Sequence, residues 1–272
     1  MPSDALQADK LPGAVVEPAP HASAEAGLTH ALVQLEEPRK RLHAAIQALP
    51  PDPQELLEAL YAGVHKLNEE AERAERRALH RLGFALAGML KKLLEKPKLR
   101  TTPSALNAAA AALELLEQLC RDRLEPNLSE PPLRLLVVDD DPIARRAVCG
   151  ALQLVFGRPE SADSGEASLA LAGEKAFDLI FMDVMMPGMD GFAACAKIHE
   201  TTSNRRTPVV FITSRDDQSS RAQAEAAGGC SFIPKPVLSS EIMLIALTFI
   251  LRTRLEESRP PQRDERLEEA VC

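Results

Sequence analysis

Three carboxylates stand side by side at Asp139, Asp140 and Asp141, directly after the apolar run LRLLVV at 133–138. Two like charges about 4 Å apart repel each other by about 1 kcal/mol in water and by about 4 kcal/mol at an effective dielectric constant of 20. A buried run that ends in this way needs a positive group nearby, or it needs solvent. Carboxylates so placed could bind a metal ion or act as a nucleophile.

Three further reactive side chains also follow apolar runs: Asp183 in LIFMDVMMPGMDGF, Thr213 in PVVFITS and Lys235 in FIPKPV. In an open parallel sheet, ligands bind beyond the carboxyl ends of the strands, where the strand order reverses. With the order 2-1-3-4-5 the first and third strands are neighbours, so Asp139, Asp140 and Asp183 would share one pocket. Carboxylate oxygens with open water positions suit Mg²⁺, and the cation would offset the repulsion. The sequence therefore predicts a magnesium site.

The elements that must position these residues alternate between strands and helices. Short runs rich in Val, Ile and Phe predict strands at 133–138, 177–182, 208–213 and 231–233, with a weaker one at 158–162. Helical segments are predicted near 142–155, 165–173, 190–200, 216–227 and 237–254. This alternation predicts an α/β domain at 133–254, a doubly wound parallel sheet of five βα units with the flavodoxin-like order.

The residues before this domain show a helical period from Leu28 to about Leu124, interrupted by Pro50-Pro51 and by Pro97 and Pro103. We expect helices at roughly 28–48, 53–95 in one or two pieces, and 103–124, the last capped by Thr102. They would form an antiparallel bundle over 27–125. Proline-rich or charged composition without a period predicts a disordered tail at 1–26, a linker at 126–132 and a charged tail at 255–272.

Composition narrows the class of protein. The net charge of −8 and the pI of about 5.4 argue against broad electrostatic binding to nucleic acid or to an anionic membrane. The five cysteines have no CxxC or zinc spacing, which fits a reducing compartment. The segment MPSDALQADK lacks the regions of a signal peptide, and the longest apolar run, IMLIALTFIL at 242–251, is about half of what a bilayer requires. We expect a soluble cytoplasmic protein without membrane insertion.

Residues 133–254 resemble the receiver domain of two-component response regulators. The resemblance rests on four motifs in order: VVDDDP, MDVMMPGMDG, the pair Thr213-Ser214 and the pair Lys235-Pro236. The resemblance implies that Asp183 accepts a phosphoryl group from a sensor histidine kinase or a phosphotransfer protein. It also implies a Mg²⁺ site made by Asp140, Asp183 and the backbone carbonyl of Met185, with Asp139 acting mainly through a water.

The same resemblance assigns further roles. Thr213 and Lys235 would contact the phosphoryl oxygens, and the Lys235–Pro236 peptide bond would be cis. Phe232 stands where the family often has a switch aromatic, frequently Tyr, so this chain lacks the hydroxyl there. Asp141 falls outside the family site and, preceding Pro142, is expected to cap the first helix of the domain.

A different enzyme class also has a DxD after an apolar strand, the haloacid-dehalogenase-like phosphatases, in which the first Asp, here Asp139, is the nucleophile. Ile143 stands where that family usually has Thr or Val, and the family gives no account of MDVMMPGMDG.

The helical region contains LYAGVHKLNEEAERA at 60–74, which resembles the H-x-L-K-G motif of histidine-phosphotransfer modules. His65 and Leu67 match, but Asn68 and Glu69 replace the expected Lys and Gly. The open alternatives are an ordinary bundle histidine, a degenerate phosphotransfer bundle that serves for docking, and an active relay histidine at His65.

The sequence therefore predicts a signalling protein that is not an enzyme beyond its own phosphoryl transfer and dephosphorylation. No segment is typical of a helix-turn-helix, so we expect a downstream protein target or a homodimer of receivers rather than a DNA-binding output. A helix that covers one face of a sheet needs only one apolar stripe, yet IMLIALTFIL is apolar nearly all round. Its surplus face should be buried against the bundle or against a second receiver.

Overall fold

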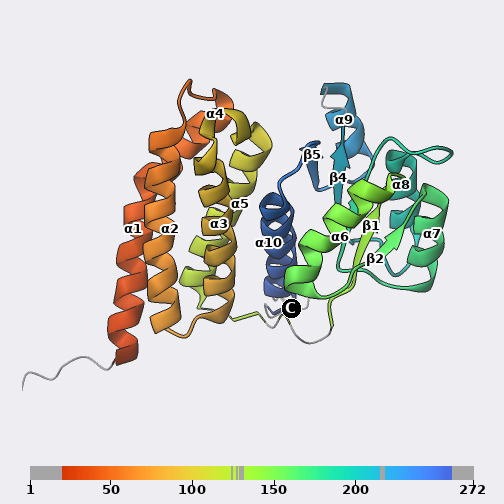
Figure 1. Ribbon diagram of the computed structural model, residues 1–272. Coiled ribbons are helices and arrows are strands. Elements are labelled where there is room, and N and C mark those ends of the chain that lie inside the picture. The colour runs from red at the N-terminus through yellow and green to blue at the C-terminus, as the bar shows by residue number, and fades with distance from the viewer. Residues whose placement is uncertain (1–19, 124, 127, 129–131, 215–217, 259–272) are drawn as a thin grey trace, which may run out of the picture.

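The computed structural model describes residues 20–258 apart from 124, 127, 129–131 and 215–217 (Figure 1). The N-terminal half holds the helices α1 (Pro20–Gln47), α2 (Gln54–Arg73), α3 (Arg77–Glu95), the single turn α4 (Pro97–Arg100) and α5 (Pro103–Asp122). The C-terminal half continues with β1 (Leu135–Val138), α6 (Pro142–Phe156), β2 (Glu160–Ala162), α7 (Gly165–Glu174), β3 (Leu179–Met182), α8 (Gly191–Glu200), β4 (Val209–Thr213), α9 (Gln218–Ala226), β5 (Ser231–Pro234) and α10 (Ser239–Ser258).

The five strands form one parallel sheet in the order β2-β1-β3-β4-β5, so the predicted fold class and strand order are confirmed. Successive side chains of a strand point to opposite faces. On β1, Leu135 and Val137 pack in one cluster with α6 and α10, whereas Leu136 and Val138 pack in a second cluster with α7, α8 and α9. The fully buried strands explain the near-continuous apolar runs in the sequence.

The helical half packs as the predicted bundle, with α1 against α2 and α5, and α3 against α2 and α5. The segment predicted at 53–95 consists of two helices, which are separated where Glu75 adopts a positive φ of 56°. Arg76, only 6% exposed, fixes this corner: its Nε donates to Glu125 at 2.7 Å, and a second guanidinium nitrogen donates to the carbonyl of Leu119 at 2.7 Å.

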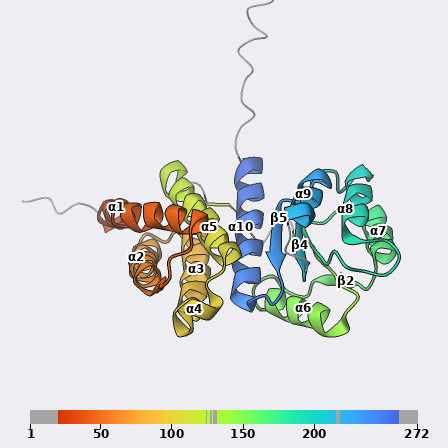
Figure 2. The same ribbon diagram turned by 90° about the horizontal axis from the view of Figure 1, so that it is seen from above.

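Helix α10 lies between the bundle and the sheet (Figure 2). It contacts α3 and α5 on one side and α6 and β3 on the other. Apolar residues all round the helix are buried, among them the consecutive Leu244, Ile245 and Ala246. The expectation that its surplus face is covered is confirmed, and the cover is the bundle. One continuous core runs from the bundle through α10 to the sheet.

Two expected boundaries are wrong. Residues 20–26, expected within a disordered tail, form the first turns of α1, where Ala24 is buried and Glu25 pairs with Arg76 at 3.3 Å. Residues 255–258, expected within the charged tail, continue α10, because Leu255 is buried and Arg254 pairs with Asp178 at 3.2 Å.

Of the other segment predictions, some are confirmed and some concern residues outside the described ranges. The caps at Thr102 and Asp141 are confirmed: their side chains accept from the backbone N–H groups of Ala105 and Ile143. The rest of the two tails and most of the linker at 126–132 lie outside the described residues. Within those that are described, no helix is both long and apolar enough to cross a bilayer.

Candidate functional site

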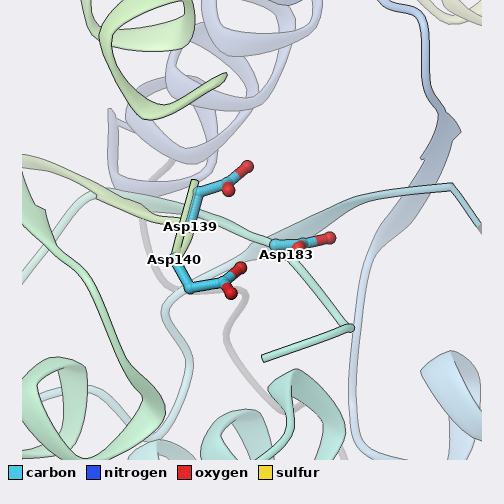
Figure 3. Close-up of side chains that lie close together, drawn as sticks. All are labelled: Asp139, Asp140 and Asp183. Carbon is cyan, nitrogen blue, oxygen red and sulfur yellow. The ribbon is translucent and has the colours of Figure 1, made fainter. Parts of the chain in front are cut away.

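The first and third strands, which are neighbours in the sheet, bring three carboxylates together (Figure 3). Asp139 and Asp140 follow β1 and Asp183 follows β3, and one oxygen from each lies within 4.8 Å of the others. Asp139 and Asp183 are buried, with 3% and 5% exposure, whereas Asp140 faces solvent. The predicted convergence of these side chains is therefore present.

Lys235, which directly follows β5, supplies the positive charge. Its Nζ donates to Asp139 Oδ2 at 2.8 Å and lies 3.5 Å from Asp183 Oδ1. Burial would lower the pKa of this ammonium, but the hydrogen bond to Asp139 and the charges of both carboxylates outweigh burial and raise it. The lysine is thus held charged between two buried acids.

The pKa of Asp183 is raised, chiefly because the carboxyl is buried and also because the charge of Asp139 is near. Lys235 and the backbone N–H groups of Val184 and Met185 act in the opposite direction without cancelling burial. Three carboxylates gather here against the one ammonium of Lys235, so the cluster carries more negative charge than the lysine offsets. A hard, oxygen-preferring divalent cation such as Mg²⁺ fits this set of donors.

The loop after β3 explains the glycine of MPGMDG. A Cβ at Gly191 would overlap the carbonyl oxygen of Asp183, so only glycine lets α8 begin this close to the strand end. Asp190 caps α8 by accepting from the N–H of Ala193 at 2.8 Å. Met185, whose side chain is exposed, lies two residues after Asp183 in this loop.

Thr213 ends β4 and is fully buried beside the same edge. Its carbonyl accepts the N–H of Lys235 at 2.8 Å, which ties the ends of β4 and β5 together. The Lys235–Pro236 bond is cis, as the family resemblance implied.

The structure adds a contact that the sequence did not indicate. Arg145 of α6 donates to the backbone carbonyl of Asp139 at 2.6 Å. The only available signal was an arginine in the first turn after the acidic triplet. Its role is to fix the end of β1, since it touches a carbonyl and not a carboxylate.

Phe232 lies in β5, three residues before Lys235, and the guanidinium of Arg221 stands 5.4 Å from the centre of its ring. The ring borders a cavity of about 620 Å³ whose walls come from both halves of the chain. Residues of α1 and α5 line one side, and residues of α9, β5 and α10 line the other.

His65 is not part of this site. It belongs to α2, a helix that lies on the side of the bundle away from the sheet (Figures 1 and 2). Its side chain is 57% exposed, with Nδ1 3.4 Å from Glu69 Oε1 and the ring 5.9 Å from that of Tyr61.

Comparison with known proteins places the C-terminal half of the chain in a family. Residues 135–246 match the response regulator receiver domain. The response regulator PleD of Caulobacter vibrioides is 38% identical over 113 residues, covering 42% of this chain and 24% of PleD. The transcriptional regulatory protein ResD of Bacillus subtilis is 33% identical over 111 residues, covering 41% of this chain and 45% of ResD. The chain thus spans less than half the length of either relative.

Two solved structures are similar to part of this chain. The chemotaxis protein CheY4 of Vibrio cholerae is 29% identical and aligns over 43% of this chain and 98% of its own, with a TM-score of 0.41. The receiver domain of the histidine kinase PA1611 of Pseudomonas aeruginosa, which has a magnesium ion in its active-site cleft, is 25% identical over 43% of this chain and 97% of its own, with a TM-score of 0.41. The family match and the curated relatives identify residues 135–246 as a receiver domain of the response-regulator family, the phosphoacceptor module of two-component systems.

Proposed function

We propose that this receiver accepts a phosphoryl group on Asp183 from a sensor histidine kinase or a phosphotransfer protein, in a Mg²⁺-dependent reaction. The observation that carries the proposal is the convergence of Asp139, Asp140 and Asp183 at the carboxyl edge of the sheet, where Lys235 contacts Asp139 and Asp183. Asp140, Asp183 and the carbonyl of Met185 would hold the ion, with Asp139 acting through a water.

The reaction is a displacement at phosphorus. An oxygen of Asp183 forms the new O–P bond while the P–N bond to the donor imidazole breaks, and the bonding electron pair leaves with the imidazole nitrogen, which takes up a proton. Bound Mg²⁺ would supply positive charge to the phosphoryl oxygens. Lys235 would turn from Asp139 to one phosphoryl oxygen, and the hydroxyl of Thr213 would donate to another. Water later cleaves the acyl phosphate, and we propose no other enzymatic activity.

The helical region is the element best placed to respond. A change of partner for Lys235 moves the end of β5, and Phe232 on the same strand borders the cavity shared with α1 and α5. We propose that phosphorylation alters this contact, with Thr213 and Phe232 as the switch residues, and so controls binding of a downstream protein. The net charge of −8 favours a protein target in the cytoplasm over DNA.

We propose that His65 does not relay phosphate. A transferring histidine gains from a nearby cation, but here Nδ1 of His65 lies 3.4 Å from the carboxylate of Glu69. At a solvated surface such a charge disfavours an incoming anion by about 1 kcal/mol.

The proposal is tested by incubating the full chain with Mg²⁺ and acetyl phosphate and mapping the modified residue. We expect one phosphoryl group, on Asp183. Asp183→Asn should abolish labelling, and so should chelation of Mg²⁺ from the wild type, whereas His65→Ala should label normally. Labelling of Asp183→Asn, or labelling that survives chelation, would contradict the assignment. Label on Asp139 would instead support the phosphatase alternative. Label on His65 would show a working phosphorelay.

A further inference from the structure

The outer faces of α2 and α3 carry two charged stripes that the proposed function does not use. These helices pack side by side in the bundle. The acidic stripe of α2 consists of the exposed residues Glu72, Glu69, His65, Ala62 and Glu58. The basic stripe of α3 consists of the exposed residues Arg77, Arg81, Phe84, Gly88 and Lys91. Both stripes follow helical spacings of three and four and lie opposite the buried residues of their helices.

The two stripes are in register along the bundle. A Cβ at Gly83 would lie 2.9 Å from Asn68 Oδ1, so residues 68 and 83 stand at the same height. Counting outward from this level, the members of the stripes match within about two residues, or about 3 Å of helix rise. The five levels pair Glu72 with Arg77, Glu69 with Arg81, His65 with Phe84, Ala62 with Gly88, and Glu58 with Lys91.

A twofold rotation turns this register into a self-complementary surface. An axis parallel to the helices, above the groove between α2 and α3, exchanges the two helices and preserves every height. The α2 of one copy then faces the α3 of the other, antiparallel to it, and each acidic level meets a basic one twice. We propose that a second copy of this chain docks here, giving a twofold dimer through the α2–α3 face.

The basic stripe offers an exposed aromatic side chain, cations and room for close approach, which a contact between two copies requires. Phe84 is 68% exposed and is the one aromatic residue among the large hydrophobic side chains that are exposed in the described part of the chain. Within the part of the chain that the structure describes, Arg77, Arg81 and Lys91 form no ion pair. Gly88 has open space where a side chain would stand, and Ala62 is small, so the two copies can approach closely at the level that these two residues share.

The acidic stripe decides between partners. A basic stripe with an aromatic residue also suits nucleic acid, but the neighbouring acidic stripe holds three carboxylates that would repel phosphates. A second copy satisfies both stripes at once. The same contact would cover His65, which agrees with a histidine that takes no part in relay.

The test is sedimentation velocity of the full chain at low and high salt, with charge reversals at one level. Wild type should dimerise, more weakly at high salt. Glu69→Lys and Arg81→Glu should each place like charges at two symmetric positions and weaken the dimer about tenfold or more. The matched control is Glu174→Lys, at an exposed position on α7, which should leave the dimer unchanged.

The decisive arm mixes the two single variants. In a mixed dimer, the lysine side chain introduced by Glu69→Lys in one copy faces the glutamate side chain introduced by Arg81→Glu in the other. The symmetric position keeps its native pair, so wild-type affinity should return. Any effect of a substitution within its own chain would not be rescued in this way. A monomeric wild type, a dimer indifferent to both reversals, or a mixture no tighter than its components would overturn the proposal. Asp183→Asn should dimerise like wild type, so the result is independent of the phosphorylation proposal.

Discussion

At the scale of single residues, the acidic site depends on one positive charge. Among the ion pairs of the described residues, Lys235 is the only cation that pairs with Asp139 and Asp183. Removing one partner of a buried ion pair leaves an uncompensated buried charge. Lys235 therefore stabilises the fold before any phosphoryl group arrives. This structural role can be measured separately from its proposed contact with the phosphoryl group.

Lys235→Gln should lower the free energy of unfolding by about 1–3 kcal/mol when Mg²⁺ is absent, because two buried carboxylates lose their counter-charge. Excess Mg²⁺ should restore most of this loss, since the cation occupies the same negative cluster. Urea melts with and without Mg²⁺ measure both effects. The control Lys175→Gln removes a surface pair with Glu160 and should cost less than about 1 kcal/mol, with no metal rescue. Equal melts for Lys235→Gln and wild type would contradict the argument.

The sequence predicted these residues because each stands at a strand end, where the fold leaves little freedom of position. The roles of Asp139 and Lys235 as direct hydrogen-bond partners could not be predicted, because they are 96 residues apart and the distance depends on how the sheet places β1 relative to β5. Arg145 escaped notice for a related reason: its partner is a backbone carbonyl, which carries no sequence signal.

At the scale of elements, α10 joins two packing units, and a buried carboxyl sits at its N-terminal end. Glu241 is 4% exposed and accepts a hydrogen bond from the hydroxyl of Ser104 on α5 at 2.7 Å. Burial raises the pKa of Glu241, and the bonds from Ser104 and from the backbone at Leu238 only partly oppose this. The contact between bundle and receiver thus contains an acid that is better tolerated neutral.

Because the pKa of Glu241 is raised in the folded protein, the stability of this contact should fall as the pH rises. Below the unfolded-state pKa of this glutamate both states bind the proton, and the stability of the native contact is complete. As the pH rises through the raised native pKa, the folded protein must ionise a buried group, and stability is lost. Glu241→Gln removes this loss, so its unfolding free energy should fall less than that of wild type between acidic and neutral pH. Melts of both proteins across that range check this, with Ser104→Ala as a second variant; parallel curves would contradict it.

Element boundaries were predictable where caps and prolines mark them, as at Thr102 and Asp141. They were not predictable where long-range contacts extend a helix. Residues 20–26 lack an apolar period, and their helix is held by the burial of Ala24 and by the pair of Glu25 with Arg76, which lies at the α2–α3 turn.

At the scale of the whole molecule, the bundle and the receiver share one hydrophobic core through α10. A fragment of residues 131–258 would expose the face of α10 that α3 and α5 cover. We expect this fragment to bind a hydrophobic dye and to self-associate, whereas the full chain does neither through this face. Fluorescence of an added dye and light scattering measure the difference. A monomeric fragment without dye binding would show that α10 does not need the bundle.

Because the bundle and the receiver share α10, the bundle cannot complete its core until α10 has been synthesised. The ribosome delivers α1 to α5 first, yet one wall of their core, α10, leaves the ribosome only after every strand of the sheet has emerged. Domains generally fold as they are synthesised, N-terminal first. Here the N-terminal helices must wait with an uncovered apolar face until the last helix of the receiver arrives. This protein therefore depends most on protection from aggregation while the bundle is still nascent. The yield of folded protein should depend more on translation rate and chaperone supply than on the stability of the finished fold.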